Sequence, residues 1–332
     1  MMVSSLVADR AAAAPAAQVA ETETPAVFGG RPLFDESLPI ARPLLPPASE
    51  ILEPYRKVIE SGTLTNGEMV RKLEAAAAQH LDVPECVAVS SCTSGLMLVE
   101  RCLGLAGRVI VPSFTFFATA HSLLWNNLEP ALADCDERSW NLDPARVERA
   151  IGPGVSAILA VHLYGNPADT AELERIAARA GVRLIFDAAH AFGAARDGRP
   201  VGGAGDAEVF SLSPTKLLVA GEGGLIATRS RKLAAALRAA RNYGDAGDYD
   251  CRELGLNARL SEFHAALALA CLPLVPRHVE RRHRLACVYE QYLGKEPGLT
   301  LQEIRPADRS TRKDFSISID EPLFGVSRRF LE

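Results

Sequence analysis

The chain has 332 residues, enough for a substantial α/β core, and this length excludes a small disulfide-stabilised domain. Hydrophobic residues make up 48% and charged residues 23%, values typical of globular proteins, so wholesale disorder, collagen-like repeats and coiled coils are excluded. The 36 basic and 41 acidic side chains give a net charge of −5 with no long block of either sign. This balance argues against a nucleic-acid-binding protein.

The cysteines and the hydropathy pattern favour a cytoplasmic protein. There are seven cysteines, an odd number, with no C-x-x-C pair and no spacing suited to zinc, so we expect reduced thiols that mostly occupy the core. No apolar run approaches the ~18 residues that a membrane span needs. The Ala-rich residues 1–28 lack a basic segment followed by an apolar one, which predicts a flexible tail and not a secretory signal.

The elements expected along the chain alternate between helices and strands. Helices at 49–61 and 68–80 come first, and seven short β-branched or apolar runs then follow at 86–90, 109–111, 131–134, 157–161, 183–187, 208–211 and 225–228. Most of these runs are apolar on both faces, as buried strands are. Helix-length segments separate the first five runs, which predicts a mainly parallel seven-stranded sheet covered by helices. The last two strands follow closely on each other, so one of them is expected to run antiparallel.

The C-terminal third is expected to be largely helical. A helical pattern spans 231–241, and a longer one spans 260–293. Pro273 and Pro276 lie inside the longer pattern and should kink or break it, because proline lacks a backbone N–H and clashes with the preceding turn. Residues 316–319 resemble one further strand.

Three polar groups stand at predicted strand ends, where open α/β sheets bind their ligands. The first is the segment SSCTSG at 90–95, between a strand and a helix. Backbone N–H groups and hydroxyls at a helix N-terminus suit a phosphate, although the same residues also form ordinary helix caps. The second is Asp187, at the end of an apolar strand, where a carboxylate needs a cationic or hydrogen-bonding partner and is either catalytic or part of an ion pair.

The third polar group is Lys216. Of the six lysines in the chain it alone follows directly on a predicted strand, and a Gly-rich turn, GEGG at 221–224, comes after it. Partial burial lowers the pKa of an amine and makes it a nucleophile toward an aldehyde, whereas a lone lysine is more often a surface residue. Phosphate, ring nitrogen and aldehyde are the three groups by which pyridoxal phosphate (PLP) is held, so the three sites together indicate a PLP enzyme.

The sequence resembles the DegT/DnrJ/EryC1/StrS family of aminotransferases over about residues 29–300. The motifs that carry the resemblance are residues 61–67 (SGTLTNG), 90–96 (SSCTSGL), 111–116 (VPSFTF), 162–165 (HLYG), 187–191 (DAAHA), 211–216 (SLSPTK) with 221–224 (GEGG), and 255–259 (GLNAR). The resemblance implies the PLP-dependent transferase fold of type I. It also implies a large PLP-binding domain at 29–245 and a smaller C-terminal α+β domain at 246–332, which we expect to be incomplete.

The resemblance also implies roles for individual residues. Lys216 would bind the cofactor aldehyde covalently and serve as the catalytic residue, and Asp187 would hold the pyridine nitrogen. The remaining cofactor contacts would be phosphate binding by Thr93, Ser94 and Ser211, ring stacking by Phe116, and a position close to the ring for His190. Asn257 would reach the phosphate of the neighbouring subunit's cofactor, so a homodimer with shared active sites is expected.

The implied reaction is amino transfer from glutamate or glutamine to a keto-sugar, at C3 or C4 of a nucleotide-linked deoxysugar. Relatives with histidine in place of the lysine dehydrate sugars, so Lys216 favours transamination. A keto-cyclitol of the scyllo-inosose type is an alternative acceptor, and a PLP-binding regulator without turnover is an alternative function. A nicotinamide dehydrogenase is disfavoured because no G-x-G-x-x-G follows the first strand, and no metal site is expected.

The sequence departs from the family pattern at several places. Cys92 replaces the usual glycine before Thr93, and the connection at 104–108 is shorter than usual. The C-terminal residues 326–332 resemble the start of a further helix of the small domain. We therefore expect that extending the chain at this end would raise activity if the short form impairs acceptor binding or dimer stability.

Overall fold

Buried apolar strands build one seven-stranded sheet, as the sequence predicts. The computed structural model describes residues 30–39, 41–251 and 253–331. The sheet has the order β1-β9-β8-β5-β4-β2-β3, and the described residues from Pro43 onward form one compact unit that holds the whole sheet. The strands are β1 (Glu85–Val89), β2 (Arg108–Pro112), β3 (Glu129–Ala133), β4 (Val155–Val161), β5 (Arg183–Asp187), β8 (Ala207–Ser211) and β9 (Gly224–Thr228).

The pairing of the strands confirms the predicted topology. β3, β2, β4, β5 and β8 run parallel to one another, whereas β9 lies antiparallel between β8 and β1. β1 therefore points the same way as β8, although the two strands are far apart in sequence. As a result, β1, β5 and β8 all end at the same edge of the sheet, and β9 begins there.

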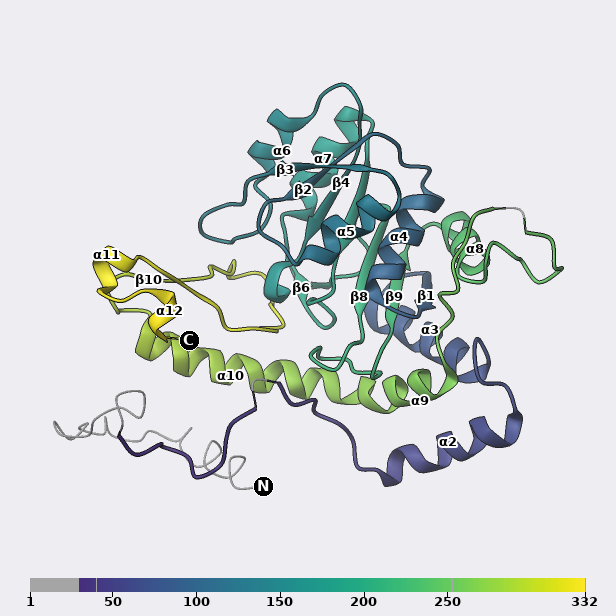
Figure 1. The fold of residues 1–332 in the computed structure, drawn as a ribbon, viewed down its shortest axis with the longest axis horizontal. Coiled ribbons are helices and arrows are strands. Elements are labelled where there is room, and N and C mark those ends of the chain that lie inside the picture. Colours follow the sequence, from purple (N-terminus) through teal and green to yellow (C-terminus); the bar gives the residue numbers. More distant parts are fainter. Residues whose placement is uncertain (1–29, 40, 252, 332) are drawn as a thin grey trace. The chain divides into compact units, whose positions relative to one another are not determined.

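Helices cover both faces of this sheet (Figure 1). They are α2 (Ser49–Ser61), α3 (Glu68–Leu81), α4 (Cys92–Cys102), α5 (Phe117–Trp125), α6 (Pro144–Ala150), α7 (Thr170–Ala180), α8 (Arg231–Ala240), α9 (Glu262–Cys271) and α10 (Val275–Leu293). Alternate residues of a strand face opposite sides, so in β2 Val109 and Val111 belong to the core cluster that α4, α5 and α8 cover, and Ile110 belongs to the cluster that α6 and α7 cover. At the other end of the sheet α3 and α9 cover the second face.

Two prolines break the long C-terminal helical pattern, as expected. α9 ends at Cys271, the short 3₁₀ turn η3 (Leu272–Leu274) contains Pro273, and α10 begins with Pro276 in its first turn. Proline is tolerated in the first turn of a helix because the N–H there has no intrahelical partner. α10 then runs for 19 residues toward the C-terminal hairpin of β10 (Leu299–Leu301) and β11 (Ile317–Ile319) (Figure 1).

The segment between β10 and β11 returns to the large sheet. Ser310 and Thr311 are fully buried, and Arg309 exchanges two backbone hydrogen bonds with Ala195 of the short hairpin β6 (Ala195–Arg196) and β7 (Arg199–Pro200). Beyond β11 come the short helices α11 (Glu321–Phe324) and α12 (Arg328–Leu331). The division into domains at residue 245 stays a prediction, and the predicted tail at 1–28 lies outside the described residues.

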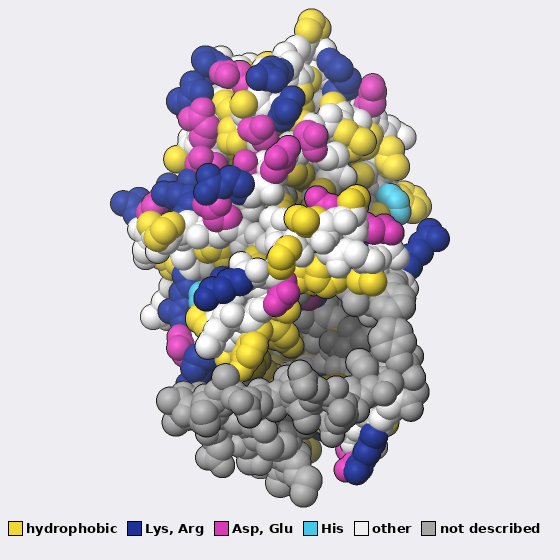
Figure 2. Space-filling view, turned by 90° about the vertical axis from the view of Figure 1, so that its left-hand side faces the viewer, with side chains coloured by type: hydrophobic (Ala, Val, Ile, Leu, Met, Phe, Trp, Pro, Cys, Tyr) yellow, Lys and Arg dark blue, Asp and Glu magenta, His cyan; other side chains and the backbone are white. Residues whose placement is uncertain are grey.

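The surface and the cysteines add two observations. Figure 2 shows basic and acidic side chains intermixed over the end of the protein that carries α6 and α7, where Arg175 and Arg179 pair with Glu148. All seven cysteines are free, but only Cys86 and Cys271 are fully buried. Cys92 and Cys102 are partly buried and pack against the core, so the expectation of core cysteines holds for four of the seven and fails for Cys135, Cys251 and Cys287. Within the described ranges, no helix is both long and apolar enough to cross a membrane.

Candidate active site

The predicted phosphate-binding segment forms the N-terminus of α4. Ser91 is the N-cap and makes a capping box with Ser94, in which the Ser91 hydroxyl accepts from the Ser94 N–H at 3.0 Å and the Ser94 hydroxyl accepts from the Ser91 N–H at 3.1 Å. Thr93 lies half-buried in the first turn. Because the helix dipole and the N–H groups of this turn favour an anion, the arrangement suits a phosphate.

The Gly-rich turn that follows Lys216 needs glycine at its last position, Gly224. It is the first residue of β9, and a Cβ atom there would lie 2.7 Å from the backbone of both Ser91 and Cys92. Only glycine lets β9 approach the α4 N-terminus this closely, since such a contact with backbone atoms cannot be relieved by moving a side chain. The glycine thus fixes the position of the helix end.

Asp187 is the last residue of β5 and is buried, with 5% of its surface exposed. Its Oδ2 accepts a hydrogen bond from Thr119 Oγ1 at 2.8 Å, and its Oδ1 accepts from the Ala189 N–H at 3.1 Å. Burial raises the pKa of this carboxyl, while Thr119, Ala189 and the charge of Lys216 act in the opposite direction. In the part of the chain that the structure describes, no basic side chain forms an ion pair with Asp187, so the site can accept a cationic N–H group.

Lys216 lies half-buried after β8, and its N–H donates to the Ser213 carbonyl at 3.0 Å. Burial lowers the pKa of its amine, and the charge of Lys313 lowers it further. The positive charge of Lys216 in turn lowers the pKa values of Asp187, Cys92 and His190. The structure thus brings the predicted lysine into one electrostatic cluster with the predicted strand-end Asp187 and with the first residue of α4.

His190 is held as a neutral imidazole. Its Nδ1 accepts a hydrogen bond from the Tyr164 N–H at 3.2 Å, and its ring stacks on the Tyr164 ring with centroids 6.1 Å apart. Burial lowers the pKa of His190 to about 3. Gly165 permits this packing because its φ is +85° and a Cβ atom there would meet the hydroxyl of Thr311 and the carbonyl of His190.

The remaining predicted residues lie near the same edge of the sheet or on the surface. Ser211 is the last residue of β8 and is buried, and its hydroxyl accepts from the Ser213 N–H at 3.4 Å. Phe116 is the N-cap of α5, and its ring is 57% exposed and packs against Phe117. Asn257 is exposed and forms a backbone bridge with Asn242. The exposure of Phe116 and Asn257 leaves both side chains accessible, and their roles stay predictions.

Two residues at the site were missed by the sequence analysis. Thr119 lies one turn into α5, and no sequence signal marks its hydroxyl as the partner of Asp187. Lys313 follows no predicted strand, so no sequence signal marks it, but its side chain is only 14% exposed and its Nζ lies 2.9 Å from both carboxylate oxygens of Asp314. Its N–H donates to the Tyr164 carbonyl at 3.0 Å, and Arg282 of α10 donates to its carbonyl.

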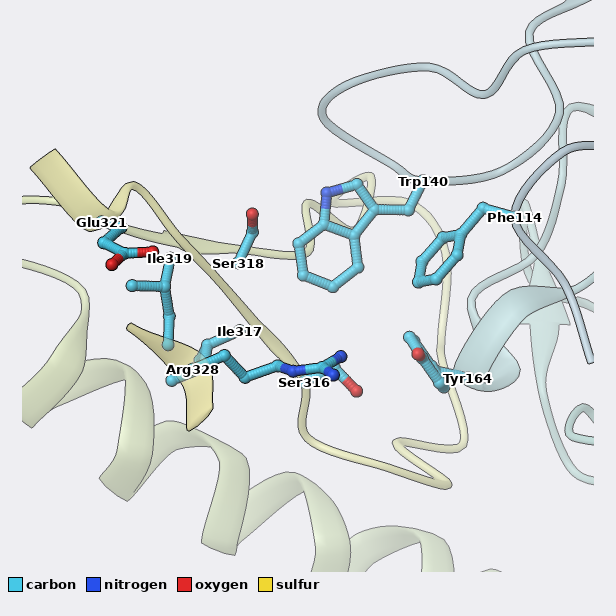
Figure 3. A pocket seen from close by; sticks show the side chains of 9 residues that line it. All are labelled: Phe114, Trp140, Tyr164, Ser316, Ile317, Ser318, Ile319, Glu321 and Arg328. Atoms are coloured by element: carbon cyan, nitrogen blue, oxygen red, sulfur yellow. The ribbon is translucent and has the colours of Figure 1, made fainter. Parts of the chain in front are cut away.

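A cavity of about 480 Å³ adjoins this cluster at Tyr164 (Figure 3). Phe114 and Trp140 both lie edge-on to the Tyr164 ring, with centroids 6.3 and 6.4 Å away. Opposite these rings, the C-terminal segment supplies the rest of the lining: Ser316, Ile317, Ser318, Ile319, Glu321 and Arg328. Figure 3 shows the Arg328 side chain extending toward Ser316. Aromatic faces combined with a few polar groups are typical of small-molecule sites.

Comparison with known proteins decides the family. The model of the DegT/DnrJ/EryC1/StrS aminotransferase family matches residues 47–329. The chain belongs to this family. The family match confirms the predicted resemblance and the fold class. It also identifies the protein as an aminotransferase.

Individual relatives agree with this assignment. A UDP-N-acetyl-3-dehydro-alpha-D-glucosamine 3-aminotransferase of Acidithiobacillus ferrooxidans is 38% identical over 260 residues, which cover 77% of this chain and 70% of the relative. The erythromycin biosynthesis sensory transduction protein EryC1 of Saccharopolyspora erythraea is 40% identical over 261 residues, covering 78% and 71%. The crystal structure of DesI in the presence of its TDP-sugar product matches with a TM-score of 0.87 at 38% identity, over 92% of this chain and 78% of that one.

Proposed function

We propose that this aminotransferase uses PLP bound to Lys216 and transfers an amino group from glutamate or glutamine to a nucleotide-linked keto-sugar. The observation that carries the proposal is the meeting of Lys216, Asp187 and the α4 N-terminus at one edge of the sheet. Relatives named for amino sugars support the choice of substrate, among them a dTDP-4-amino-4,6-dideoxy-D-glucose transaminase of Escherichia coli that is 31% identical over 299 residues.

The residues present fit PLP. The buried Asp187 carboxylate has hydroxyl, N–H and thiol donors but, among the described residues, no ion pair with a basic side chain, so a protonated ring nitrogen would complete its environment. The α4 N-terminus offers backbone N–H groups to the phosphate, and Thr93, Ser94 and Ser211 are our proposed side-chain partners. The half-buried amine of Lys216 has a lowered pKa, as a nucleophile toward an aldehyde requires.

The protein's own groups divide the work of the reaction. Bound PLP supplies the aldehyde and a conjugated ring that takes up electrons when the donor's Cα–H bond breaks. The Nζ of Lys216 takes the proton from the donor's Cα and returns it to the product side, acting as base and then as acid. Asp187 holds the proton of the ring nitrogen. His190 is neutral, so it adds no positive charge beside the amine of Lys216.

We place the acceptor in the cavity beside Tyr164. Its aromatic side suits stacking of a flat ring such as a nucleobase, and the guanidinium of Arg328 with the hydroxyls of Ser316 and Ser318 suits a diphosphate. Because Tyr164 contacts His190, an acceptor in the cavity reaches the cofactor cluster from one side. No observation favours a keto-cyclitol over the nucleotide-linked sugar, so both are assayed.

We further propose a homodimer in which Asn257 contributes to the neighbouring subunit's site, and the division into large and small domains at residue 245. The exposure of Asn257 and of the Phe116 ring supports the homodimer, because both side chains are accessible to a neighbouring subunit. Size measurement by light scattering, with and without PLP, tests the dimer. Mixing Lys216→Ala with Asn257→Ala protein tests the shared site, since restored activity requires subunits that complement each other.

The first experiment is the absorption spectrum of the protein with PLP, before and after adding glutamate, for wild type and Lys216→Ala. We expect a visible band in the wild type that glutamate removes and that the variant lacks, and a loss of amino transfer of at least ~10³-fold in the variant. Lys232→Ala, a change at an exposed residue of α8, is the control and should behave as wild type. A folded wild-type protein without the band would contradict the proposal and favour a regulator, a role that the name of the EryC1 relative also suggests for that protein.

A further inference from the structure

Glu100 is a fully buried carboxyl that the proposed reaction does not use. It lies on α4, and none of its surface is exposed. Its Oε1 accepts a hydrogen bond from Ser122 Oγ at 2.6 Å, and its Oε2 accepts from Asn126 Nδ2 at 2.7 Å. Ser122 lies on α5 and Asn126 is the C-cap of that helix, so one carboxyl ties two helices together. An apolar side chain would fill this space without the cost of burying a carboxyl.

The contacts of Glu100 continue to Asp187. Ser122 Oγ also lies 3.0 Å from the carbonyl of Thr119, and Thr119 Oγ1 donates to Asp187 Oδ2 at 2.8 Å. The Thr115 hydroxyl is 2.8 Å from that of Thr119 and can donate to it. Two sets of hydrogen bonds therefore meet at Thr119: its backbone carbonyl faces Ser122 and Glu100, and its side-chain hydroxyl faces the carboxylate that we assign to the ring nitrogen.

The single hydroxyl proton of Ser122 has two acceptors. When Glu100 is ionised, Ser122 donates to its carboxylate. When Glu100 is protonated, its acid proton can go to Ser122 Oγ, and Ser122 then donates to the Thr119 carbonyl. Burial raises the pKa of Glu100 to about 7, Ser122 and Asn126 oppose this rise, and the charge of Asp187 adds to it. The raised pKa brings the change between the two arrangements closer to neutral pH than it would be for an ordinary glutamate.

We propose that Glu100 is a positioning residue that acts through Ser122 to set the placement of Thr119 against Asp187. This inference rests on the proposed function, because Asp187 and the N-terminus of α4 are the proposed cofactor partners. It assigns to α4 a second task. One end of the helix receives the phosphate, and a side chain nearer its other end controls the partner of the ring nitrogen.

The test compares the PLP affinity of wild type, Glu100→Gln and Ser122→Ala between pH 5.5 and 8.5, measured by equilibrium dialysis. Glutamine is an uncharged mimic of the protonated carboxyl. We therefore expect Glu100→Gln to equal the wild type below about pH 6 and to bind PLP about three- to tenfold more weakly above about pH 8, where the wild-type carboxylate favours a protonated ring nitrogen. Ser122→Ala removes the hydroxyl between Glu100 and Thr119 and should weaken PLP binding by a similar factor. The PLP affinity of this variant should no longer change with the protonation of Glu100.

Thermal unfolding of the PLP-free protein gives a second measurement. The folded state holds the Glu100 proton more tightly than the unfolded state, so this group's contribution to stability is present below the ordinary pKa of a glutamate and is lost as pH rises through about 7. The wild type should therefore lose stability relative to Glu100→Gln over this range. Glu262→Gln is the matched control, since Glu262 is also buried but holds the N–H groups at the start of α3. It should lower the stability of the protein, but the ratio of wild-type to Glu262→Gln affinity for PLP should stay constant across pH.

The outcomes separate the two proposals. A wild-type protein that binds no PLP at any pH would refute the proposed function. A wild-type protein that binds PLP, with a wild-type to Glu100→Gln affinity ratio that is constant across pH, would refute the positioning role of Glu100 alone. If Glu100→Gln does not fold, Ser122→Ala with unchanged PLP affinity refutes it equally.

Discussion

The cofactor side and the acceptor side of the candidate site are built from different kinds of segment. On the cofactor side, Asp187, Ser211 and the α4 N-terminus are fixed at the ends of buried strands, and the close approach at Gly224 holds them. On the acceptor side, Phe114 and Trp140 come from loops after strands, and residues 316–328 come from the C-terminal segment. The proposed cofactor contacts are thus attached to the core, whereas the proposed acceptor contacts lie on segments that can vary without disturbing that core.

The largest effect is expected at the rigid side. Gly224→Ala would drive a Cβ atom into the backbone of Ser91 and Cys92, with a strain of about 1–3 kcal/mol, and we expect PLP affinity to fall by about tenfold or more. Fluorescence titration with PLP measures this loss. Gly152→Ala is the control, because a Cβ atom there meets only a side-chain nitrogen of Arg108 at 3.9 Å. Equal affinities in the two variants would show that the approach of β9 does not hold the phosphate site.

Substitutions on the acceptor side should change the KM for the acceptor and leave the PLP affinity unchanged. Trp140→Ala and Arg328→Ala remove a ring and a positive charge from the cavity, and we expect each to raise the KM for the nucleotide-linked sugar about tenfold. The visible band of bound PLP and the half-reaction with glutamate should stay unchanged, because neither side chain belongs to the cofactor cluster. A change in the glutamate half-reaction would contradict the separation of the two sides.

Lys313 joins the two sides, and the effect of changing it should be the smallest. Lys313→Met removes a positive charge that lowers the pKa of Lys216 and leaves Asp314 without its partner, and both changes raise that pKa. A base must be neutral to take a proton, so the acid limb of the pH–rate profile should move to higher pH by less than ~1 unit, with a few-fold loss of kcat/KM at neutral pH. Lys313→Arg keeps the charge and should keep the profile; a shift in Lys313→Arg as large as that in Lys313→Met would contradict an electrostatic role.

The same division explains what could be predicted from sequence. The strands are apolar on both faces, so their positions and the mainly parallel sheet could be predicted, as could Asp187 at the end of β5; Lys216 lies in the turns after β8, which ends at Ser211. The return of residues 309–313 toward the large sheet could not be predicted, because no local pattern encodes a contact between Thr311 and His190. Glu100 was also missed, since a glutamate in a helical pattern is ordinarily exposed, and only the packing of α4 on α5 buries it.

The antiparallel strand β9 has a consequence for how the protein folds. β1 pairs only with β9, residues 85–89 with residues 224–228, so this strand cannot join the sheet until most of the chain has been synthesised. Closing so long a loop is entropically costly, and contacts of such high sequence separation form late. The α4 N-terminus, which follows β1 directly, therefore acquires its neighbour Gly224 in one of the last steps of folding. A chain released before β9 docks would carry every residue of the proposed phosphate site but would lack the close approach of Gly224 that positions the α4 N-terminus.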